Sequence, residues 1–304
     1  MNDLLTIKDL TDKEILELLD LAEDVKKNPN EYSSALNGKS IALLFQKTST
    51  RTRISFENGM YQLGGNAIYI DWRTTNLHLG ALKDEIKSIS CYVDLIMARV
   101  NEHEILEVMR DASNVPVING LSDMYHPCQI LSDLMTLREK FGNFENIQVS
   151  WVGDGNNVCN SLIIGCVKLK IPILVATPER YRPHQEIIDW VKKEKNSQFF
   201  KIYTNPKEAI KEADVVYTDT FVSMGQEKET EKRLKIFLPK FQVNSELLSS
   251  ASKSPLIMHC LPAHRGFEIT NEILDSENSI VFHQAKNRIH FQKALMLKLL
   301  KKNK

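Results

Sequence analysis

Apolar positions along the chain fall either in short continuous runs or in stripes with helical spacing. Residues 41–45, Ile-Ala-Leu-Leu-Phe, form one such run, which is typical of a strand buried on both faces. Phe56, Met60 and Leu63 follow at the spacing of one helix face. This alternation of strand and helix continues to the C-terminus, and it predicts parallel sheets joined by right-handed crossovers.

The predicted strands are 41–45, 67–70, 94–98, 115–118, 147–152, 172–176, 199–203, 214–218, 256–259 and 280–282. The predicted helices are 11–27, 52–63, 84–92, 102–112, 127–141, 157–169, 183–194, 206–212 and 285–301. Thr11 and Glu14 have the spacing of a capping box at the start of the first helix. The helix at 127–141 has no strand partner of its own, so we expect it to bridge two domains.

A chain of 304 residues is long enough for two domains. We predict two open parallel-sheet α/β domains with the active site in the cleft between them. The first domain would span 1–130, with the C-terminal helix at 284–304 returning to it, and the second would span 131–283. No internal repeat of 20–50 residues is present.

Composition narrows the class of protein. Lys and Arg together number 39, as do Asp and Glu, so net charge gives no argument for a nucleic-acid or membrane partner. No apolar run approaches the roughly 20 residues of a membrane-spanning helix, and the N-terminus lacks the pattern of a signal peptide. Five cysteines without paired spacing favour a reducing compartment. We therefore expect a soluble cytoplasmic protein.

The segment Ser-Thr-Arg-Thr-Arg at 49–53 lies where the first predicted strand ends and its helix begins. The first N–H groups of a helix have no intrahelical partner, and the helix dipole favours an anion there. Three hydroxyls and two guanidinium groups exceed what capping one helix requires. A solvated basic helix start is the alternative, but the set of residues favours a phosphate site.

Other chemically distinctive residues also follow predicted strands or open predicted helices. Open α/β domains bind ligands beyond the carboxyl ends of their strands, so we expect these residues to face one cleft. They are Arg99, His126, Gln129, Asn160, segments 153–157 and 219–225, and segment 259–262.

Several of these segments have alternative interpretations. Segment 153–158, Gly-Asp-Gly-Asn-Asn-Val, lacks the third glycine of a dinucleotide-binding turn, which argues against a dehydrogenase. His259 and Cys260 are adjacent, and neighbouring strand residues point to opposite faces, which argues against a cysteine-protease pair. The alternatives that stay open are a buried inert thiol for Cys260, a cap or surface residue for His126 and a solvated turn for 219–225.

Four motifs together resemble those of the carbamoyltransferases that act on aspartate or ornithine. They are Ser-Thr-Arg-Thr-Arg at 49–53, His-Pro-Cys-Gln at 126–129, Asp-x-x-x-Ser-Met-Gly at 219–225 and His-Cys-Leu-Pro at 259–262. The first two are shared with the aspartate branch, and the last two are typical of the ornithine branch. Their order and spacing match over essentially the full chain.

The resemblance implies transfer of the carbamoyl group of carbamoyl phosphate to the δ-amino group of L-ornithine, giving L-citrulline and phosphate. Residues 1–130 would bind carbamoyl phosphate and residues 131–283 would bind ornithine. The resemblance also implies a homotrimer with sites at subunit interfaces, no metal and no organic cofactor. We expect two small-molecule substrates as ligands, and a role in arginine biosynthesis.

The resemblance also assigns individual site residues. Carbamoyl phosphate would be bound by Ser49, Thr50, Arg51, Thr52, Arg99, His126, Gln129, Leu261 and Arg288. Ornithine would be bound by Asn160, Asp219, Ser223, Met224 and Cys260. Arg99, His126 and Cys260 would be the catalytic residues.

The chain departs from the pattern of this family in two places. Segment 78–85 reads His-Leu-Gly-Ala-Leu-Lys-Asp-Glu, where the family usually has Gly-Glu-Ser followed by Asp-Thr-Ala in a loop that reaches a neighbouring subunit's site. Lys83 is the candidate substitute in that loop. Lys286 stands where the family usually has Glu.

Two rival functions follow from the same motifs. One is carbamoyl transfer to N-acetylornithine or putrescine. Asp219 argues against N-acetylornithine, because its carboxylate suits a free α-ammonium group. The other is a non-catalytic relative that binds carbamoyl phosphate.

Overall fold

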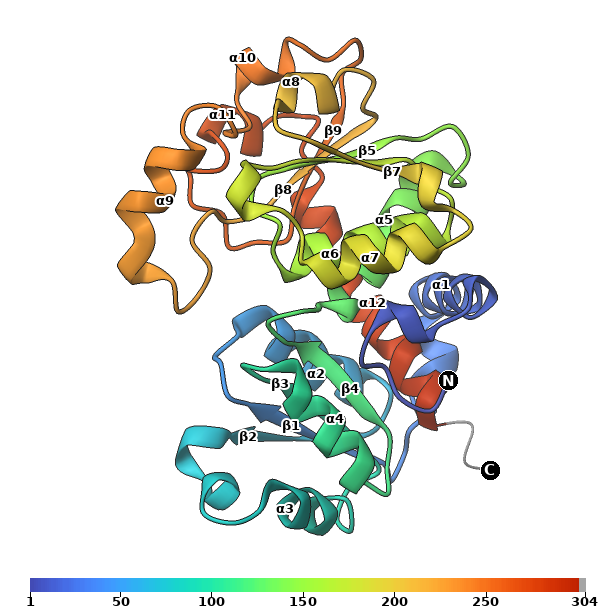
Figure 1. Cartoon of the computed structure of the whole chain (residues 1–304). Helices are drawn as coiled ribbons and strands as arrows, with labels where there is room; N and C mark the ends of the chain where they lie inside the picture. Colours follow the sequence, from blue (N-terminus) through green and yellow to red (C-terminus); the bar gives the residue numbers. More distant parts are fainter. Residues whose placement is uncertain (301–304) are drawn as a thin grey trace. The chain divides into compact units, whose positions relative to one another are not determined.

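A computed structural model describes residues 1–300 of the chain, which divides into two compact units (Figure 1). Unit 1 comprises 1–135 together with 287–300, and unit 2 comprises 136–286. The last residues of the predicted C-terminal helix, 301–304, lie outside the described part. The chain passes between the units within two helices, α5 (Pro127–Phe141) and α12 (Val281–Leu300).

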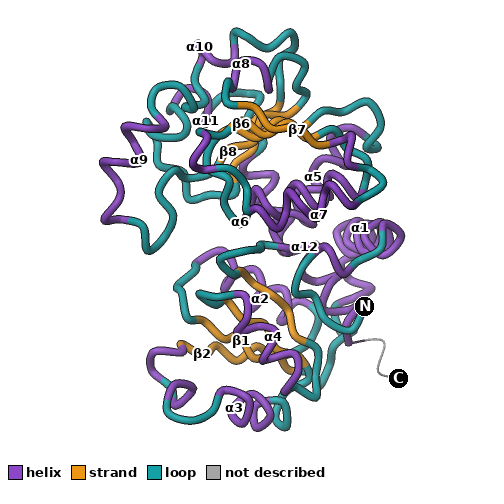
Figure 2. The backbone as a smooth tube through the Cα atoms, in the orientation of Figure 1, coloured by secondary structure: helices purple, strands orange, loops and turns teal. Residues whose placement is uncertain are grey.

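The sheet of unit 1 is parallel and has four strands in the order β2-β1-β3-β4. The strands are β1 (Ser40–Phe45), β2 (Asn66–Asp71), β3 (Leu95–Arg99) and β4 (Val117–Leu121). Every residue of β3 is buried, as are all but the first of β1, which agrees with their continuous apolar runs. Figure 2 shows the strands of this unit alternating with helices along the chain.

Helices cover the sheet of unit 1. They are α1 (Asp12–Lys27), α2 (Thr50–Gln62), α3 (Leu82–Ile89) and α4 (His103–Ala112), with α12 beside α1 and α2. Ala42, Leu44 and Ile96 of the sheet pack in one buried cluster with residues of α3 and α4. The capping box predicted at the start of α1 is confirmed, because the Thr11 side chain accepts from Glu14 N and Glu14 accepts from Thr11 N.

The sheet of unit 2 is also parallel and has five strands in the order β7-β6-β5-β8-β9. The strands are β5 (Val149–Val152), β6 (Ile173–Ala176), β7 (Phe200–Tyr203), β8 (Val215–Thr218) and β9 (Leu256–His259). Its helices are α6 (Asn157–Lys168), α7 (Gln185–Lys193), α8 (Pro206–Ala209), α9 (Thr230–Phe237), α10 (Ser245–Leu248) and α11 (Asn271–Leu274). The prediction of two parallel-sheet α/β domains is therefore confirmed.

Apolar side chains from both sides of this second sheet are buried. Val152, Val216 and Ile257 pack in one cluster with residues of α8, α9, α10 and α11. Trp151 and Tyr217 alternate with these positions, so they lie on the opposite face, where their ring centroids are 5.2 Å apart.

One predicted strand is wrong. Residues 280–282 were expected to extend the sheet, but Val281 begins α12 and only an isolated bridge joins Ile257 to Ser279. A short apolar run does not by itself distinguish a strand from the first turn of a buried helix. The helices α9, α10 and α11 were not predicted; α10 and α11 have four residues each, too few to show a periodic stripe.

The strand orders locate the ligand-binding edge of each unit. In an open α/β sheet, ligands bind beyond the carboxyl ends of the strands where the strand order reverses. In unit 1 the order reverses between β1 and β3, and in unit 2 it reverses between β5 and β8. The loops that follow these four strands contain segments 46–49, 100–102, 153–156 and 219–229, which include or adjoin most of the predicted site.

Among residues 1–300, no helix combines the length and apolar character needed to cross a membrane.

Candidate active site

The start of α2 has the structure expected of an anion site. Ser49 is the N-cap, and its hydroxyl accepts a hydrogen bond from Thr52 N at 3.3 Å. Thr50 is exposed on the first turn, Arg51 is half-buried, and Thr52 is buried. The remaining N–H groups of this turn and the dipole of a 13-residue helix favour an anion here.

Arg53 does not belong to this site, although the sequence placed both guanidinium groups of the segment at the helix start. Its Nε donates to Glu57 Oε1 at 2.9 Å, one helical turn further along. Its guanidinium carbon also lies 3.7 Å from the centre of the Tyr69 ring. Arg51 therefore supplies the guanidinium group of this turn.

Arg99 is the last residue of β3, and it is buried. The pairing of β3 with β4 shifts there, because Ala98 pairs with Asn119 whereas Arg99 pairs with Leu121. The extra residue is Gly120, where a Cβ would lie 2.3 Å from Met97 Sδ. This irregularity turns the end of the strand, as bulges commonly do beside functional sites.

His126, Gln129 and Arg288 come together in unit 1. His126 directly precedes α5, and Gln129 is in its first turn. Arg288, on α12, donates from Nη1 to Gln129 Oε1, and its Nη2 lies 3.5 Å from Thr52 Oγ1. The structure thus connects a residue near the C-terminus to the start of α2.

Asp133 was not predicted as part of this cluster. It is buried, and its Oδ1 accepts from Gln129 Nε2 at 2.9 Å. The two residues are four apart on α5, so their helical spacing was the available signal. By fixing the Gln129 amide, Asp133 directs Gln129 Oε1 to Arg288.

The electrostatics of the cluster determine the charge of His126. Burial, followed by the positive charges of Arg288, Arg99 and Arg51, holds the pKa of His126 well below its ordinary value of 6.5. The imidazole is therefore neutral at pH 7, and it can donate a hydrogen bond without adding a further positive charge. Cys128 is chemically inert, because burial raises the pKa of its thiol to about 12.

Lys47 is a second residue that the sequence did not single out. It lies two residues beyond β1 and is half-buried. Burial and then the charge of Arg99 lower the pKa of its ammonium group, while Asp123 acts in the opposite direction. Unit 1 therefore concentrates positive charge at the carboxyl ends of β1 and β3, which is the environment that a phosphate group requires.

Unit 2 brings together Asp219, Asn156 and Cys260. Asp219 follows β8 and is buried. Its Oδ2 accepts from Asn156 Nδ2 at 2.7 Å, and its Oδ1 accepts from Cys260 Sγ at 3.0 Å. Asn156 also caps α6 through its Oδ1, so its amide is fixed at both ends. A fixed, buried carboxylate of this kind suits an ammonium group.

The other residues predicted to bind ornithine lie in neighbouring segments. Asn160 is buried in the first turns of α6, and its Oδ1 accepts from His184 N at 3.2 Å. Ser223 is half-buried in the loop after β8, and Met224 beside it is exposed. Leu261 lies in the turn after β9 with a φ of 58°; its contact with carbamoyl phosphate stays a prediction.

Asp154 and Arg233 form a buried ion pair that anchors the loop after β8. Arg233, on α9, donates from Nη2 to Asp154 Oδ2 and from Nε to the carbonyl of Phe221. Its guanidinium group also lies over the ring of Tyr181, 4.6 Å from the ring centre. Burial raises the pKa of Asp154 to about 6, although Arg233 acts in the opposite direction.

Asp219, His259 and Cys260 are the described residues grouped closely enough to hold a metal ion, with ligand atoms within 4.8 Å of one another. Both ring nitrogens of His259 are already hydrogen-bonded. Nδ1 accepts from Leu261 N at 2.8 Å, and Nε2 lies 3.0 Å from Glu268 Oε1. Because a metal would have to break one of these bonds, the donor set does not favour one.

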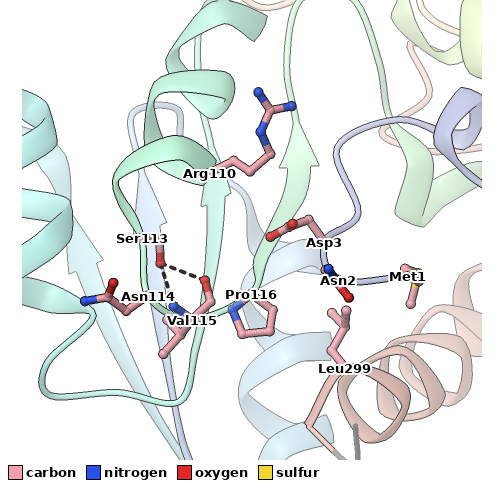
Figure 3. Close-up of a pocket in the computed structure, with 9 residues that line it drawn as sticks. All are labelled: Met1, Asn2, Asp3, Arg110, Ser113, Asn114, Val115, Pro116 and Leu299. Atoms are coloured by element: carbon pink, nitrogen blue, oxygen red, sulfur yellow. Dashed lines mark hydrogen bonds between the residues drawn. The ribbon is translucent and has the colours of Figure 1, made fainter. Parts of the chain in front are cut away.

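Two features of unit 1 lie apart from the residues described so far. A pocket of about 230 Å³ is lined by Asp3, Arg110 and Pro116, among others (Figure 3). Pro116 directly precedes β4, so this pocket adjoins the amino end of that strand, opposite to the candidate site. Lys83 is exposed on the first turn of α3, and no contact within residues 1–300 connects it with the other predicted residues.

Comparisons with known proteins agree with this geometry. Residues 2–139 match the family model for the aspartate/ornithine carbamoyltransferase carbamoyl-P binding domain. Residues 145–299 match the model for the Asp/Orn binding domain of the same family. The class is thus a two-domain carbamoyltransferase, and the chain belongs to the aspartate/ornithine carbamoyltransferase family.

Individual relatives are similar over nearly the full chain. The ornithine carbamoyltransferase of Archaeoglobus fulgidus is 47% identical, over 99% of this chain and 98% of that protein. The structure of the Pyrococcus furiosus ornithine carbamoyltransferase has a TM-score of 0.94 at 46% identity, covering 100% of this chain and 98% of that one. The anabolic ornithine carbamoyltransferase of Campylobacter jejuni has a TM-score of 0.92 at 37% identity, with 100% of both chains covered.

Proposed function

We propose that this chain transfers the carbamoyl group of carbamoyl phosphate to the δ-amino group of L-ornithine, giving L-citrulline and phosphate. The observation that carries the proposal is the cluster in unit 1 beside the start of α2. There burial and the positive charges of Arg288, Arg99 and Arg51 lower the pKa of His126 and keep its ring neutral. Unit 1 would bind carbamoyl phosphate, and unit 2 would bind ornithine.

The phosphate group would lie at the N-terminus of α2. A helix terminus contributes about 0.3–1 kcal/mol to anion binding, and up to ~2 kcal/mol when partly buried. A hydrogen bond from a charged group adds about 1.5–3 kcal/mol, whereas micromolar affinity needs about 8 kcal/mol. The helix start is therefore insufficient alone, and Arg51 and Arg288 would supply much of the binding, with Ser49, Thr50 and Thr52 as hydroxyl donors.

The carbonyl group would be polarised by Arg99, His126 and the Thr52 hydroxyl. Donors fixed before the reaction stabilise the oxyanion that develops during acyl transfer, and losing one costs about 10²–10³ in rate. His126 can serve as such a donor because its ring stays neutral among the guanidinium groups. Gln129, fixed by Asp133, would orient the carbamoyl nitrogen.

Ornithine would be held through its α-amino and α-carboxylate groups by unit 2. Asp219 supports this assignment because its buried carboxylate, bonded to Asn156 and Cys260, is suited to an ammonium group. Asn160, Ser223 and Met224 would complete the pocket. The same carboxylate disfavours N-acetylornithine, because an acetylated amine would leave a buried charge without its partner.

The nucleophile sets the energetic requirement. The δ-ammonium group of ornithine should have a pKa like that of lysine, near 10.4, so releasing its proton at pH 7.5 costs about 4 kcal/mol. Orienting two substrates can supply about 7–11 kcal/mol, which is more than a general base usually provides. Positioning and charge stabilisation would therefore dominate, and the departing phosphate can accept the proton.

We also propose a homotrimer in the cytoplasm, working in the direction of arginine biosynthesis. Ile54 and Tyr61 are exposed apolar residues seven positions apart on α2, and so on one face of that helix, which supports an interface with a second copy. Lys83 would contribute from such a copy. Light scattering should give three times the chain mass of 34.8 kDa. All five cysteines are free thiols, in keeping with a reducing compartment.

The activity is tested by incubating the protein with carbamoyl phosphate and either ornithine, N-acetylornithine or putrescine. Mass spectrometry should detect a carbamoylated product when the amine is ornithine and no such product when it is N-acetylornithine or putrescine. A product from another amine in preference to ornithine would refute the substrate, and no product from any amine would refute the enzymatic function.

The phosphate assignment is tested by calorimetry on two neighbouring arginines. Arg51→Ala should weaken carbamoyl phosphate binding by about 10- to 100-fold, the loss of one charged hydrogen bond. Arg53→Ala is the matched control, because Arg53 is paired with Glu57, and its affinity should stay within about twofold. Equal effects of the two variants would contradict the assignment.

A further inference from the structure

The turn that follows β9 needs a specific support. It contains Cys260 and Leu261, and Leu261 has a φ of 58°, in the left-handed region that disfavours a residue with a branched side chain. Such a conformation persists only where surrounding contacts determine it. The contact here is the hydrogen bond from Leu261 N to His259 Nδ1 at 2.8 Å.

This hydrogen bond fixes the tautomer of His259. An N–H donor approaches Nδ1, so Nδ1 must be the unprotonated nitrogen and the ring proton must be on Nε2. Nε2 lies 3.0 Å from Glu268 Oε1, and both side chains are fully buried. Glu268 is therefore the acceptor that keeps the proton on Nε2 and leaves Nδ1 available to Leu261.

His259 is also held from its backbone. His259 N donates to Gln284 Oε1 at 3.1 Å, and Gln284 Nε2 donates to the Tyr217 hydroxyl at 2.8 Å. Both partners belong to unit 2 and are buried. The backbone and the ring of His259 are thus fixed independently, and Glu268 controls only the ring.

Glu268 reaches a second loop of the candidate site. Its Oε1 accepts from His264 N at 2.5 Å, and His264 Nδ1 lies 2.7 Å from Thr220 Oγ1. Thr220 follows Asp219, the residue that accepts from Cys260. One buried carboxylate therefore connects the turn after β9 with the loop after β8.

We propose that Glu268 is a positioning residue for amino-acid binding: it fixes the His259 tautomer and thereby holds the Cys260–Leu261 turn against Asp219. This inference rests on the proposed function, which assigns Cys260 and Asp219 to ornithine. Glu268 itself is fully buried, so it acts through His259 and His264 and does not contact the substrate.

The experiment compares Glu268→Leu with Glu268→Gln. Leucine removes the acceptor at similar volume, and it should raise the KM for ornithine at least about tenfold, the cost of leaving a buried donor unpaired. Glutamine keeps an oxygen acceptor for His259 Nε2, and it should restore the KM to within about threefold of wild type. In both variants the Kd for carbamoyl phosphate, measured by calorimetry, should change by less than the KM for ornithine, because Leu261 is the one residue of this turn that is assigned to carbamoyl phosphate.

Glu272→Leu is the matched control, because Glu272 is an exposed acid four residues further along the chain. Its KM for ornithine should not change. If Glu268→Leu has a wild-type KM for ornithine, or if it weakens carbamoyl phosphate and ornithine equally, the positioning role is overturned.

Two substitutions of His259 give an answer even if Glu268→Leu does not fold. His259→Asn places an acceptor for Leu261 N near the position of Nδ1, but it has no donor that reaches Glu268. His259→Gln keeps a donor to Glu268 near the position of Nε2, but it has no acceptor for Leu261 N. The proposal requires both bonds, so both variants should raise the KM for ornithine. A wild-type KM for His259→Asn would show that the bond between His259 and Glu268 is dispensable, and the role of Glu268 in fixing the His259 tautomer would then be overturned.

These outcomes are distinct from a failure of the proposed function. If the wild-type protein forms no citrulline, the assigned reaction is wrong. If it forms citrulline and the Glu268 and His259 variants keep their KM, only the positioning role is wrong.

Discussion

The buried pair of Asp154 and Arg233 gives a stability prediction whose pH dependence can be worked out. Burial raises the pKa of Asp154 from its ordinary 3.8 to about 6, and two units correspond to about 3 kcal/mol. The folded pKa is the higher one, so this group favours folding most below pH 3.8, and that contribution is lost as the pH rises through 6.

Replacing Arg233 by methionine keeps most of the volume over Tyr181 and Phe237 but leaves the Asp154 carboxylate buried without its cation. Breaking a buried pair in this way costs about 3–5 kcal/mol. Arg233 acts to lower the pKa of Asp154, so its removal raises that pKa further. At pH 5.5 the carboxyl group can then take up a proton, and we expect the destabilisation to be smaller than at pH 8.

Part of the free energy of unfolding that Arg233→Met loses should not depend on pH. Arg233 also donates to the carbonyl of Phe221, and leaving that buried acceptor unpaired costs about 1–3 kcal/mol at any pH. The double variant Arg233→Met with Asp154→Asn removes both charges. Compared with Arg233→Met, it should regain most of the pH-dependent loss in the free energy of unfolding and none of the loss caused by the unpaired Phe221 carbonyl.

The measurement is urea unfolding at pH 5.5 and 8, followed by tryptophan fluorescence in a Trp72→Phe background. The remaining tryptophans, Trp151 and Trp190, both belong to unit 2, and the Trp151 indole donates to the carbonyl of Asp154 at 3.0 Å. Lys232→Met, at an exposed position of the same helix, should change the free energy of unfolding by less than about 0.5 kcal/mol. A loss for Arg233→Met that is equal at the two pH values would refute the reasoning.

Four further predictions concern the reaction and the strand ends. Asp219→Asn should raise the KM for ornithine more than about tenfold while sparing carbamoyl phosphate, and an equal loss of both in steady-state kinetics would sink the division of labour between the units. Activity should rise between about pH 7 and 9 as the ornithine amine deprotonates. His126→Gln should lower kcat about 10²–10³-fold. It should not shift the dependence of activity on pH, because the low pKa of His126 keeps its ring neutral over this range. Gly120→Ala should lower the free energy of unfolding by about 1–3 kcal/mol, because the new Cβ would lie 2.3 Å from Met97 Sδ and 3.2 Å from the Ala98 carbonyl; an unchanged urea midpoint would contradict the close approach.

The sequence by itself determined the elements and their class. Short segments rich in apolar residues predicted nine of the strands, and the tenth segment, at 280–282, proved to be the start of α12. The capping box at Thr11 and the helix at 127–141 were predicted with their correct starts. These features are local, because hydrophobic periodicity and capping depend on residues within a few positions of one another.

Strand-end residues were also predictable as a set. Parallel strands place their carboxyl ends at one edge, so the positions of Ser49, Arg99 and Asp219 along the chain were enough to assign them to ligand-binding loops. The sequence did not determine which strands are neighbours. The reversal of order between β1 and β3, and between β5 and β8, appears only in the assembled sheets.

Only the tertiary structure decided the partners of the charged groups. It places the Arg53 guanidinium group over the ring of Tyr69 on β2 and away from the anion site, and it brings Arg288 to Gln129 across 159 positions of the chain. It also pairs Glu268 with His259 in a fully buried position. Hydrogen bonds and ion pairs act over a few ångströms, and the packing of distant segments sets those separations. Residue type and spacing therefore indicated which groups could react or bind, while the fold determined which of them meet.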